Sequence, residues 1–475
     1  MTGPSRAGIE RLGVHVPRWS LDRQELAKNW SGRSGPGRRT VANYDEDTLT
    51  MGVEAALDAL GPDPADRAGI DAVLFATTTP VFTEKQHAVV VASALELPSS
   101  QCYDITGSLR SGLDAVRLAS ALIESGSARR VLVVAADRRD TQPGGPHERL
   151  SGDAGAAVVI GPGGDAASGG GAGPLLLSLT AQACVGDPGA GTWRAPSEPW
   201  TNIADDRFVS TELLTPWLVE AAQSVLGDDQ PVAAGFASPL ARVENSVLSA
   251  LRLTADSASG LLDSDIGYCG VAHPFLQLAL AIDGRTAGQK ILIAAAGDGA
   301  AAVLAEVVDA AAAGSAAARI TTALRHRRDL PVGMYQRMRG QLPVEPVSPY
   351  TSEMLLRREQ STGLQLQGTR CTKCGRAHFP GRRVCLGCKA LDAMETLRLP
   401  RSGTLFTHTV EHLFPVPVNQ LIMGVVEVDE VRVYTQVTDT EPDECAPGQA
   451  VTLVLRRLHD GGHLPHYFWK AKVAH

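Results

Sequence analysis

Two parts of the chain repeat the same order of predicted strands and helices. The first part has its landmarks at 72–79, 103–112 and 131–161. The second part has the corresponding patterns at 231–239, 265–274 and 291–300. Each part runs from an apolar strand through a turn that opens an apolar helix to a strand with a glycine turn. This repeat predicts an α/β fold of two similar halves, with helices on both faces of the sheet and a site between the halves.

The turn at 103–112 is the first candidate for that site. It leads into a helix expected over 113–124, whose apolar residues recur at helical spacing. Small residues and a hydroxyl at the mouth of a helix suit an active-site turn, because the first backbone N–H groups of a helix have no partner within it. An ordinary strand-to-helix connection with small residues for packing is the alternative.

Composition excludes several classes of protein. A chain of 475 residues with 44% hydrophobic and 20% charged residues is globular and long enough for roughly two to four domains. A net charge of −8 gives no general reason to bind nucleic acid, although a local basic patch for a phosphorylated ligand stays open. Apolar runs fall short of the ~18 residues of a membrane span, and the start lacks a signal-peptide core, so we expect a cytoplasmic protein with no membrane partner.

Four of the eight cysteines are paired in the sequence at the spacing of a metal site: Cys371, Cys374, Cys385 and Cys388. Two Cys-X-X-Cys pairs let four thiolates surround one zinc ion and leave no position for water, which predicts a structural site. Four free cysteines are the alternative. Basic residues around the pairs would offset the thiolate charge or contact an acidic ligand.

The remaining patterns divide the chain further. Several short strands after residue 400 predict a small barrel, and Gly/Ala-rich residues 162–174 read as a linker between the halves. We therefore expect the first α/β half at 1–162, the second at 175–310, a linker at 311–350, a helix with the zinc ribbon at 351–398 and the barrel at 399–475.

Segments 45–56, 76–80 and 152–157 resemble the thiolase superfamily, nearest its 3-hydroxy-3-methylglutaryl-CoA synthase and ketoacyl synthase III branch. The resemblance covers roughly residues 8–308. Residues from about 350 onward resemble an acyl-CoA-associated OB-fold family with a rubredoxin-like zinc ribbon. Together the resemblances imply a duplicated αβαβα fold, a homodimer, and acyl-CoA or carrier-bound acyl thioesters as substrates.

The family's catalytic groups are replaced at the matching positions. The slot of the nucleophilic cysteine falls on Leu109, and the slot of the histidine falls on Ala237. The asparagine position falls on Tyr268, and the general-acid glutamate position on Thr78. The resemblance therefore implies the fold and the substrate class, but not condensation through an acyl-cysteine.

Five residues are candidates for replacement chemistry. Ser108 has a hydroxyl at the helix mouth, where a developing anion is stabilised, and His273 from the second half is its candidate base. Cys269 is a second possible nucleophile, Tyr268 a general acid or hydrogen-bond donor, and Arg110 a bidentate site for carboxylate or phosphate. Helix capping, a hydrogen-bonded turn histidine and a packed cysteine are the structural alternatives.

Three functions agree with these residues. The first is an acyl-CoA-dependent acyltransferase that forms a C–C bond, in specialised metabolism. The second is a CoA-thioester retro-aldolase, which resembles steroid side-chain aldolases and needs an acid or base but no nucleophile. The third is a non-catalytic scaffold that binds or channels acyl-CoA.

Overall fold

The computed structural model describes residues 7–61, 64–67, 69–97, 100–163, 174–196, 198–309, 314–342, 353–412, 416–418, 420–461 and 464–474. The chain forms two compact units. Unit 1 comprises Met1–Ala42, Met51–Ala92 and Leu97–Tyr335, and unit 2 comprises Asn43–Thr50, Ser93–Glu96 and Gln336–His475. No helix among the described residues combines the length and the apolarity of a membrane span.

A ten-stranded sheet organises unit 1, in the order β12-β11-β13-β14-β8-β1-β7-β6-β4-β5. The first half contributes β1 (Ala7–His15), β4 (Ala72–Thr77), β5 (Gln101–Thr106), β6 (Val131–Asp137) and β7 (Ala154–Pro162). The second half contributes β8 (Leu177–Gly186), β11 (Ala233–Ala237), β12 (Asp256–Ser257), β13 (Lys290–Ala296) and β14 (Gly299–Val307). Antiparallel pairing of β1 with β8 joins the halves.

The two halves have the same topology. β4 pairs in parallel with β5 and β6, and β6 pairs antiparallel with β7. In the same way β11 pairs in parallel with β12 and β13, and β13 pairs antiparallel with β14. The helices correspond too. They are α2 (Thr48–Leu60), α3 (His87–Ala94) and α4 (Ser111–Glu124), matched by α7 (Thr215–Leu226), α8 (Arg242–Leu251) and α9 (His273–Ile282). The predicted duplication and α/β fold are confirmed.

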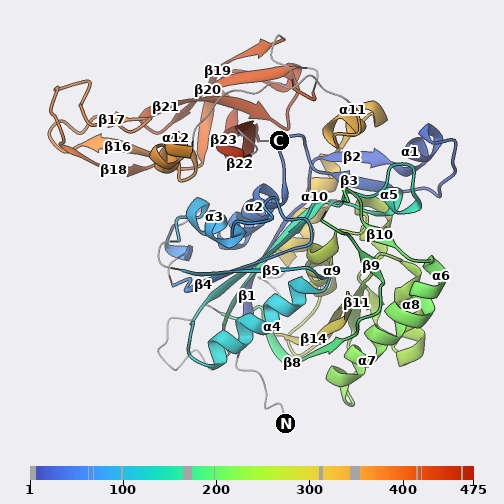
Figure 1. Cartoon of the computed structure of the whole chain (residues 1–475). Coiled ribbons are helices and arrows are strands. Elements are labelled where there is room, and N and C mark those ends of the chain that lie inside the picture. Colours follow the sequence, from blue (N-terminus) through green and yellow to red (C-terminus); the bar gives the residue numbers. More distant parts are fainter. Residues whose placement is uncertain are drawn as a thin grey trace. The chain divides into compact units, whose positions relative to one another are not determined.

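Strand residues of the second half alternate between two apolar cores. Ala233 and Ile291 belong to the core that contains α4 and α9, whereas Ala234 and Leu292 pack with α7 and α8. Figure 1 shows α7 and α8 together beside β11 and β14. Because both faces of the sheet are covered there, β11 and residues 291–296 of β13 are apolar throughout rather than alternating with polar residues.

Further elements of unit 1 lie outside the large sheet. They are α1 (Arg23–Asn29), α5 (Pro146–Leu150), α6 (Asp206–Phe208), α10 (Gly314–Arg325), and the short sheets β15 (Arg328–Asp329)-β2 (Trp19–Asp22)-β3 (Arg38–Val41) and β10 (Asn202–Ile203)-β9 (Thr192–Trp193). The segment expected as a linker at 311–350 thus contains α10 and β15, followed by α11 (Val332–Met338). Its residues 311–313 and 343–350, and residues 164–173 of the expected linker at 162–174, lie outside the described parts of the chain.

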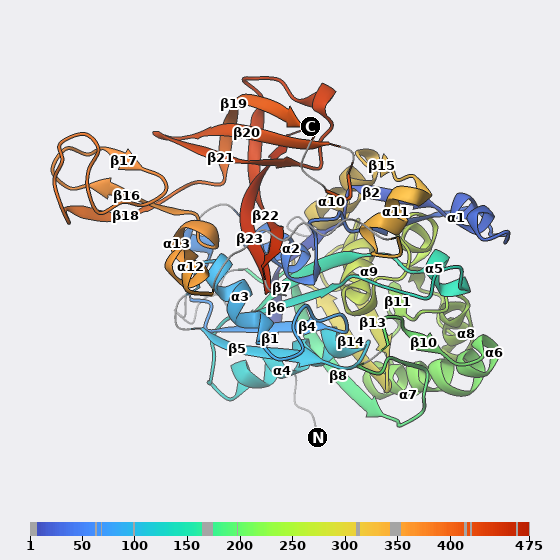
Figure 2. The ribbon, with the colours of Figure 1, turned by 45° about the horizontal axis from the view of Figure 1, so that its top comes forward.

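Unit 2 contains a closed barrel of five strands, in the order β19-β20-β21-β23-β22. Their bounds are β19 (Ser402–Glu411), β20 (Leu421–Val428), β21 (Val431–Thr438), β22 (Ala450–Gly461) and β23 (Leu464–Val473). Before the barrel come α12 (Glu353–Arg358), α13 (Gln360–Gly363) and a sheet of β16 (Gln367–Cys371), β17 (Ala377–His378) and β18 (Met394–Arg398). Figure 2 shows this small sheet extending beside the barrel. The barrel and the cysteine-bearing segment agree with the sequence prediction.

A buried cluster of charges joins the barrel to residues 43–50 within unit 2. Lys470 Nζ lies 2.8 Å from Asp45 Oδ2, and an Arg456 guanidinium nitrogen lies 3.0 Å from both Glu46 Oε1 and Asp439 Oδ2. All five side chains are almost fully buried. Burial raises the pKa of Asp45 and lowers that of Lys470, although the opposite charges partly offset both shifts. Each of these buried side chains therefore remains charged because an oppositely charged side chain lies beside it.

Candidate functional site

The turn at 107–112 lies where β5 passes into α4. The helix begins at Ser111, and no side chain caps its first backbone N–H groups. Ser108 Oγ is buried and has no hydrogen-bond partner among the described residues. Ser108 is therefore not a side-chain cap, which was one structural alternative. Backbone carbonyls accept from two of the first helix N–H groups instead, since the Ser111 nitrogen donates to the Ser108 oxygen at 3.1 Å and the Leu113 nitrogen donates to the Arg110 oxygen at 2.9 Å.

Residues of the second half approach this turn closely. A Cβ atom added at Gly297 would lie 2.8 Å from Ser108 Oγ and 2.8 Å from the Leu109 nitrogen. A Cβ atom at Gly112 would lie 2.5 Å from the Val271 carbonyl oxygen. Such distances are too short for any side chain. The missing side chain at Gly112 lets the turn at 107–112 meet the loop at 266–273, and the one at Gly297 lets it meet the turn between β13 and β14. The structure thus brings together the two stretches that the repeat in the sequence paired.

The two residues after Ser108 have structural partners. Leu109 is 5% exposed and belongs to the central apolar core. Arg110 Nε donates to Asp114 Oδ2 at 3.1 Å, and the same guanidinium donates to the Val185 carbonyl. The Arg110 side chain thus bridges α4 and β8, and an anionic ligand would have to share it with Asp114.

The loop at 266–273 carries the other three candidates. Tyr268 is held by backbone bonds, since its nitrogen donates to the Leu150 oxygen at 2.8 Å and its oxygen accepts from the Gly152 nitrogen at 2.9 Å. The phenol oxygen is buried without a hydrogen-bond partner among the described residues. Burial raises the pKa of Tyr268 well above its ordinary value of 10, so the phenol keeps its proton at neutral pH.

Cys269 and His273 are neutral groups in this environment. Cys269 is fully buried, and burial raises the pKa of its thiol well above 9, which leaves almost no nucleophilic thiolate. His273 Nδ1 accepts from the Cys269 backbone nitrogen at 3.4 Å, and its ring centroid lies 5.0 Å from that of Tyr268. Burial lowers the pKa of His273 to about 3. Such an imidazole is neutral at pH 7 and a weak base.

This histidine makes stability depend on pH. Its folded pKa of about 3 lies below the ordinary 6.5, so between these values the unfolded chain binds a proton that the folded chain does not. The contribution of the neutral, buried His273 to the free energy of unfolding is complete above pH 6.5. Below pH 6.5 this contribution falls by about 1.4 kcal/mol per pH unit. We expect His273→Gln to flatten this acid loss in urea unfolding between pH 7.5 and 5.5. The exposed His326→Gln serves as the control, and equal slopes in wild type and His273→Gln would contradict the assignment.

Asp137 joins the parts of the site, and the sequence analysis did not single it out. It ends β6, is fully buried, and accepts from Thr77 Oγ1 at 2.9 Å and Thr78 Oγ1 at 2.8 Å. It also accepts from the Val271 nitrogen at 3.1 Å. Arg139 donates to Thr78 Oγ1 at 2.8 Å. The signal available in the sequence was a carboxylate at the end of an entirely apolar strand.

The arrangement favours hydrogen-bond donation over nucleophilic attack. Two buried hydroxyls, of Ser108 and Tyr268, have no partner among the described residues, and both keep their protons at neutral pH. Donors of this kind stabilise negative charge that develops on an oxygen atom of the substrate. Neither Cys269 nor His273 has the protonation properties of a nucleophile or a strong base.

The four cysteines of unit 2 form a separate cluster, in which the four Sγ atoms all lie within 4.8 Å of one another. Cys371 and Cys388 are 3.6 Å apart, and Cys374 and Cys385 are 3.5 Å apart. Tetrahedral zinc with bonds of about 2.3 Å places its sulfurs about 3.8 Å apart, so the set fits that ion. Backbone N–H groups, first that of Cys388, lower the pKa of Cys385 to about 5, which favours the thiolate.

Known proteins are similar to much of unit 1. The family model of 3-oxoacyl-[acyl-carrier-protein] synthase III matches residues 103–173, beginning at the candidate turn. Hydroxymethylglutaryl-CoA synthase of Aeropyrum pernix is 29% identical over 361 residues, which are 72% of this chain and 97% of that protein.

Two solved structures share the fold. An HMG-CoA synthase complexed with CoA has a TM-score of 0.61 at 19% identity and covers 73% of this chain and 94% of its own. The curacin biosynthetic pathway HMG synthase, in complex with acetyl donor-ACP, has a TM-score of 0.57 at 18% identity and covers 82% of this chain and 99% of its own.

Proposed function

Because the chain has the fold of the thiolase superfamily and resembles its hydroxymethylglutaryl-CoA synthases, we propose that it is an acyltransferase. The proposed enzyme forms a carbon–carbon bond on a CoA-bound or carrier-bound acyl thioester. The observation that carries the proposal is the meeting of the turn at 107–112 with the loop at 266–273 at the uncapped start of α4. The similarity to the curacin-pathway enzyme supports a place in specialised metabolism.

The reaction proceeds without a cysteine-bound acyl intermediate. The nucleophile slot holds the buried apolar side chain of Leu109, and the nearby thiol of Cys269 is held in its protonated form. The acyl group accordingly stays on coenzyme A or its carrier. The C–C bond then forms by direct attack of one thioester enolate on a second carbonyl. The α-carbon of the first thioester loses a proton, and the acceptor oxygen, or the thiolate that a thioester acceptor releases, takes one up.

Three of the candidate residues, and Asp137, have a role in this scheme. Tyr268 donates its phenol proton in a hydrogen bond to the enolate or thioester oxygen, and Ser108, before the start of α4, donates to the second carbonyl oxygen as it gains charge. Asp137 positions the loop through the Val271 nitrogen. Arg110, turned by its bond to Asp114, orients a negatively charged part of the substrate.

Replacing Tyr268 by phenylalanine tests the donor role. The ring and its packing against His273 remain while the hydroxyl is lost, so we expect kcat to fall about 10²–10³-fold with KM little changed. Tyr103→Phe is the matched control, because the Tyr103 hydroxyl is exposed and bonds Gln101. Full activity of Tyr268→Phe in steady-state kinetics would remove Tyr268 from the mechanism.

Intact-protein mass spectrometry during turnover of an acyl-CoA panel tests the absence of an acyl-enzyme. We expect product without a mass gain on the protein. An adduct that maps to Ser108 and disappears in Ser108→Ala would contradict direct attack and show that Ser108 is a nucleophile. Thioester binding with no turnover of any substrate would contradict the enzyme and favour a scaffold.

The packed pair of Tyr268 and His273 also favours a second candidate, a CoA-thioester retro-aldolase. A retro-aldol step needs one group to take the hydroxyl proton and a donor for the enolate oxygen, and no covalent intermediate. The low pKa of His273 weakens it as the base, which is why we place this function second. Release of an aldehyde or ketone from β-hydroxyacyl-CoA, in preference to condensation, would favour it.

Two further features belong to the proposal. The four-cysteine cluster binds a structural zinc ion, as its sulfur spacing supports. The protein forms a homodimer, supported by β5, which stands at the end of the large sheet with Tyr103 42% exposed. An edge strand leaves backbone N–H and C=O groups available for pairing with a second copy.

A further inference from the structure

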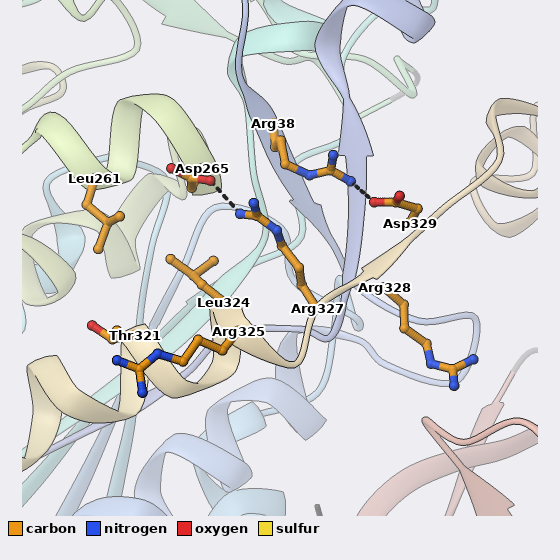
Figure 3. A pocket seen from close by; sticks show the side chains of 9 residues that line it. All are labelled: Arg38, Leu261, Asp265, Thr321, Leu324, Arg325, Arg327, Arg328 and Asp329. Carbon is orange, nitrogen blue, oxygen red and sulfur yellow. Dashed lines mark hydrogen bonds and ion pairs between the residues drawn. The ribbon is translucent and has the colours of Figure 1, made fainter. Parts of the chain in front are cut away.

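A cavity of about 900 Å³ lies outside the candidate acyl site of unit 1. Its lining comes from the end of α10, from β15 and β3, and from the segment before the Tyr268 loop. Four of the residues around it are arginines: Arg38, Arg325, Arg327 and Arg328. Figure 3 shows these residues around the cavity. None belongs to the turn at 107–112 or the loop at 266–273.

Two of the arginines are held in place by carboxylates. Arg327 forms an ion pair with Asp265, and Arg38 forms one with Asp329. Arg38 Nε also donates to Ser20 Oγ at 2.8 Å. With four guanidinium groups and two carboxylates in the lining, the cavity keeps a net positive charge. The Asp329 side chain is 87% exposed, so an anion can replace it at Arg38 at little cost.

Arg325 supplies an uncommitted cation. It is the last residue of α10, is exposed, and has no hydrogen bond or ion pair among the described residues. Figure 3 shows its guanidinium on the side of Thr321 and Leu324. A cation at a helix C-terminus is favoured by the helix dipole, which accounts for Arg325 alone. The dipole does not account for the cavity or for the further arginines around it.

The remaining lining consists of the apolar side chains of Leu261 and Leu324 and the hydroxyl-bearing side chain of Thr321. A volume of about 900 Å³ is within the range of small-molecule sites, about 300–1,000 Å³. Guanidinium groups bind phosphate oxygens in bidentate geometry, and leucines offer a surface for an organic ring. We propose that this cavity is a binding site for a phosphorylated organic anion of nucleotide size, separate from the acyl site and independent of the acyl chemistry.

Calorimetry with the full chain tests the site with three probes. Adenosine 3′,5′-bisphosphate represents the phosphate-bearing end of coenzyme A, ADP represents a free nucleotide, and adenosine lacks phosphate. We expect at least one phosphorylated probe to bind with a dissociation constant below about 1 mM, weakening with salt, and adenosine not to bind. The tighter of the two phosphorylated probes identifies the source of the ligand.

Substitutions locate the binding. We expect Arg325→Gln to weaken it by about 10-fold or more, and Arg325→Gln with Arg327→Gln to abolish it. Arg129→Gln is the matched control, because Arg129 is 83% exposed and lies outside the cavity. Arg325 is exposed, so its loss leaves the fold intact. Absence of binding by both phosphorylated probes, equal binding of adenosine, or an affinity unchanged in both variants would overturn the proposal.

Discussion

Cys385→Ser is expected to release the metal of the four-cysteine cluster and to unfold residues 367–398. The two pairs of thiols have the separations that a tetrahedral ion requires, and the short strands β16–β18 enclose little apolar core of their own. Metal binding in such modules contributes about 10–16 kcal/mol, so its loss exceeds what the segment can retain by packing. Metal analysis should find one zinc per chain in the wild type and none in the variant, with hydrogen exchange reporting the unfolding.

Cys102→Ser is the control for this prediction, since Cys102 is a free cysteine in β5 of unit 1. It should keep the full zinc content. The barrel strands should stay protected in both variants, because they bury their own core around Trp469 and Val433. A wild-type protein with no zinc, or a Cys385→Ser variant with unchanged exchange at 367–398, would refute the structural zinc.

Lys470→Met is expected to destabilise unit 2 by about 3–5 kcal/mol. The substitution removes the ammonium that lies 2.8 Å from Asp45 Oδ2 and leaves that carboxylate with a hydrogen bond from Thr438 Oγ1 at 2.9 Å and with Arg456 at 3.9 Å. A buried charge without a close opposite charge loses its hydration and gains less in return. The loss of stability is measured by thermal unfolding, with hydrogen exchange of the barrel amides as the probe of unit 2.

Arg383→Gln is the surface control for Lys470→Met. It removes a similar 2.9 Å contact with Asp392, but both of those side chains are more than half exposed, so little change is expected. Adding Asp45→Leu to Lys470→Met should recover part of the lost stability, because it removes the carboxylate left without its ammonium. Equal unfolding temperatures for Lys470→Met and wild type would show that the cluster contributes nothing.

The architecture was predictable because it rests on periodic and repeated patterns. Residues 131–136 of β6 and 291–296 of β13 are apolar at every position, as is typical of strands covered on both faces, and the order of strands and helices repeats in the two halves. The paired cysteines were predictable for a related reason, since two residues between ligands suffice to bring their sulfurs together. By contrast, α10 and α11 occupy part of a segment that was expected to be a linker.

The chemistry of the candidate site was only partly predictable. The sequence indicated that residues 103–112 and 265–274 would converge. It did not indicate that His273 is buried with a pKa of about 3, or that Asp137 connects both halves through Val271. The arginines of the cavity come from residues 38 and 325–328, which are remote in the chain.

The sequence alone therefore determined the duplicated α/β fold, the barrel and the clustering of the four paired cysteines, because periodicity, repetition and cysteine spacing act over a few residues. The tertiary structure decided which of the candidate groups keep their protons, which lie in contact and where positive charge gathers. Burial and charge are set by the packing of segments that are far apart in the chain, and no local pattern records that packing.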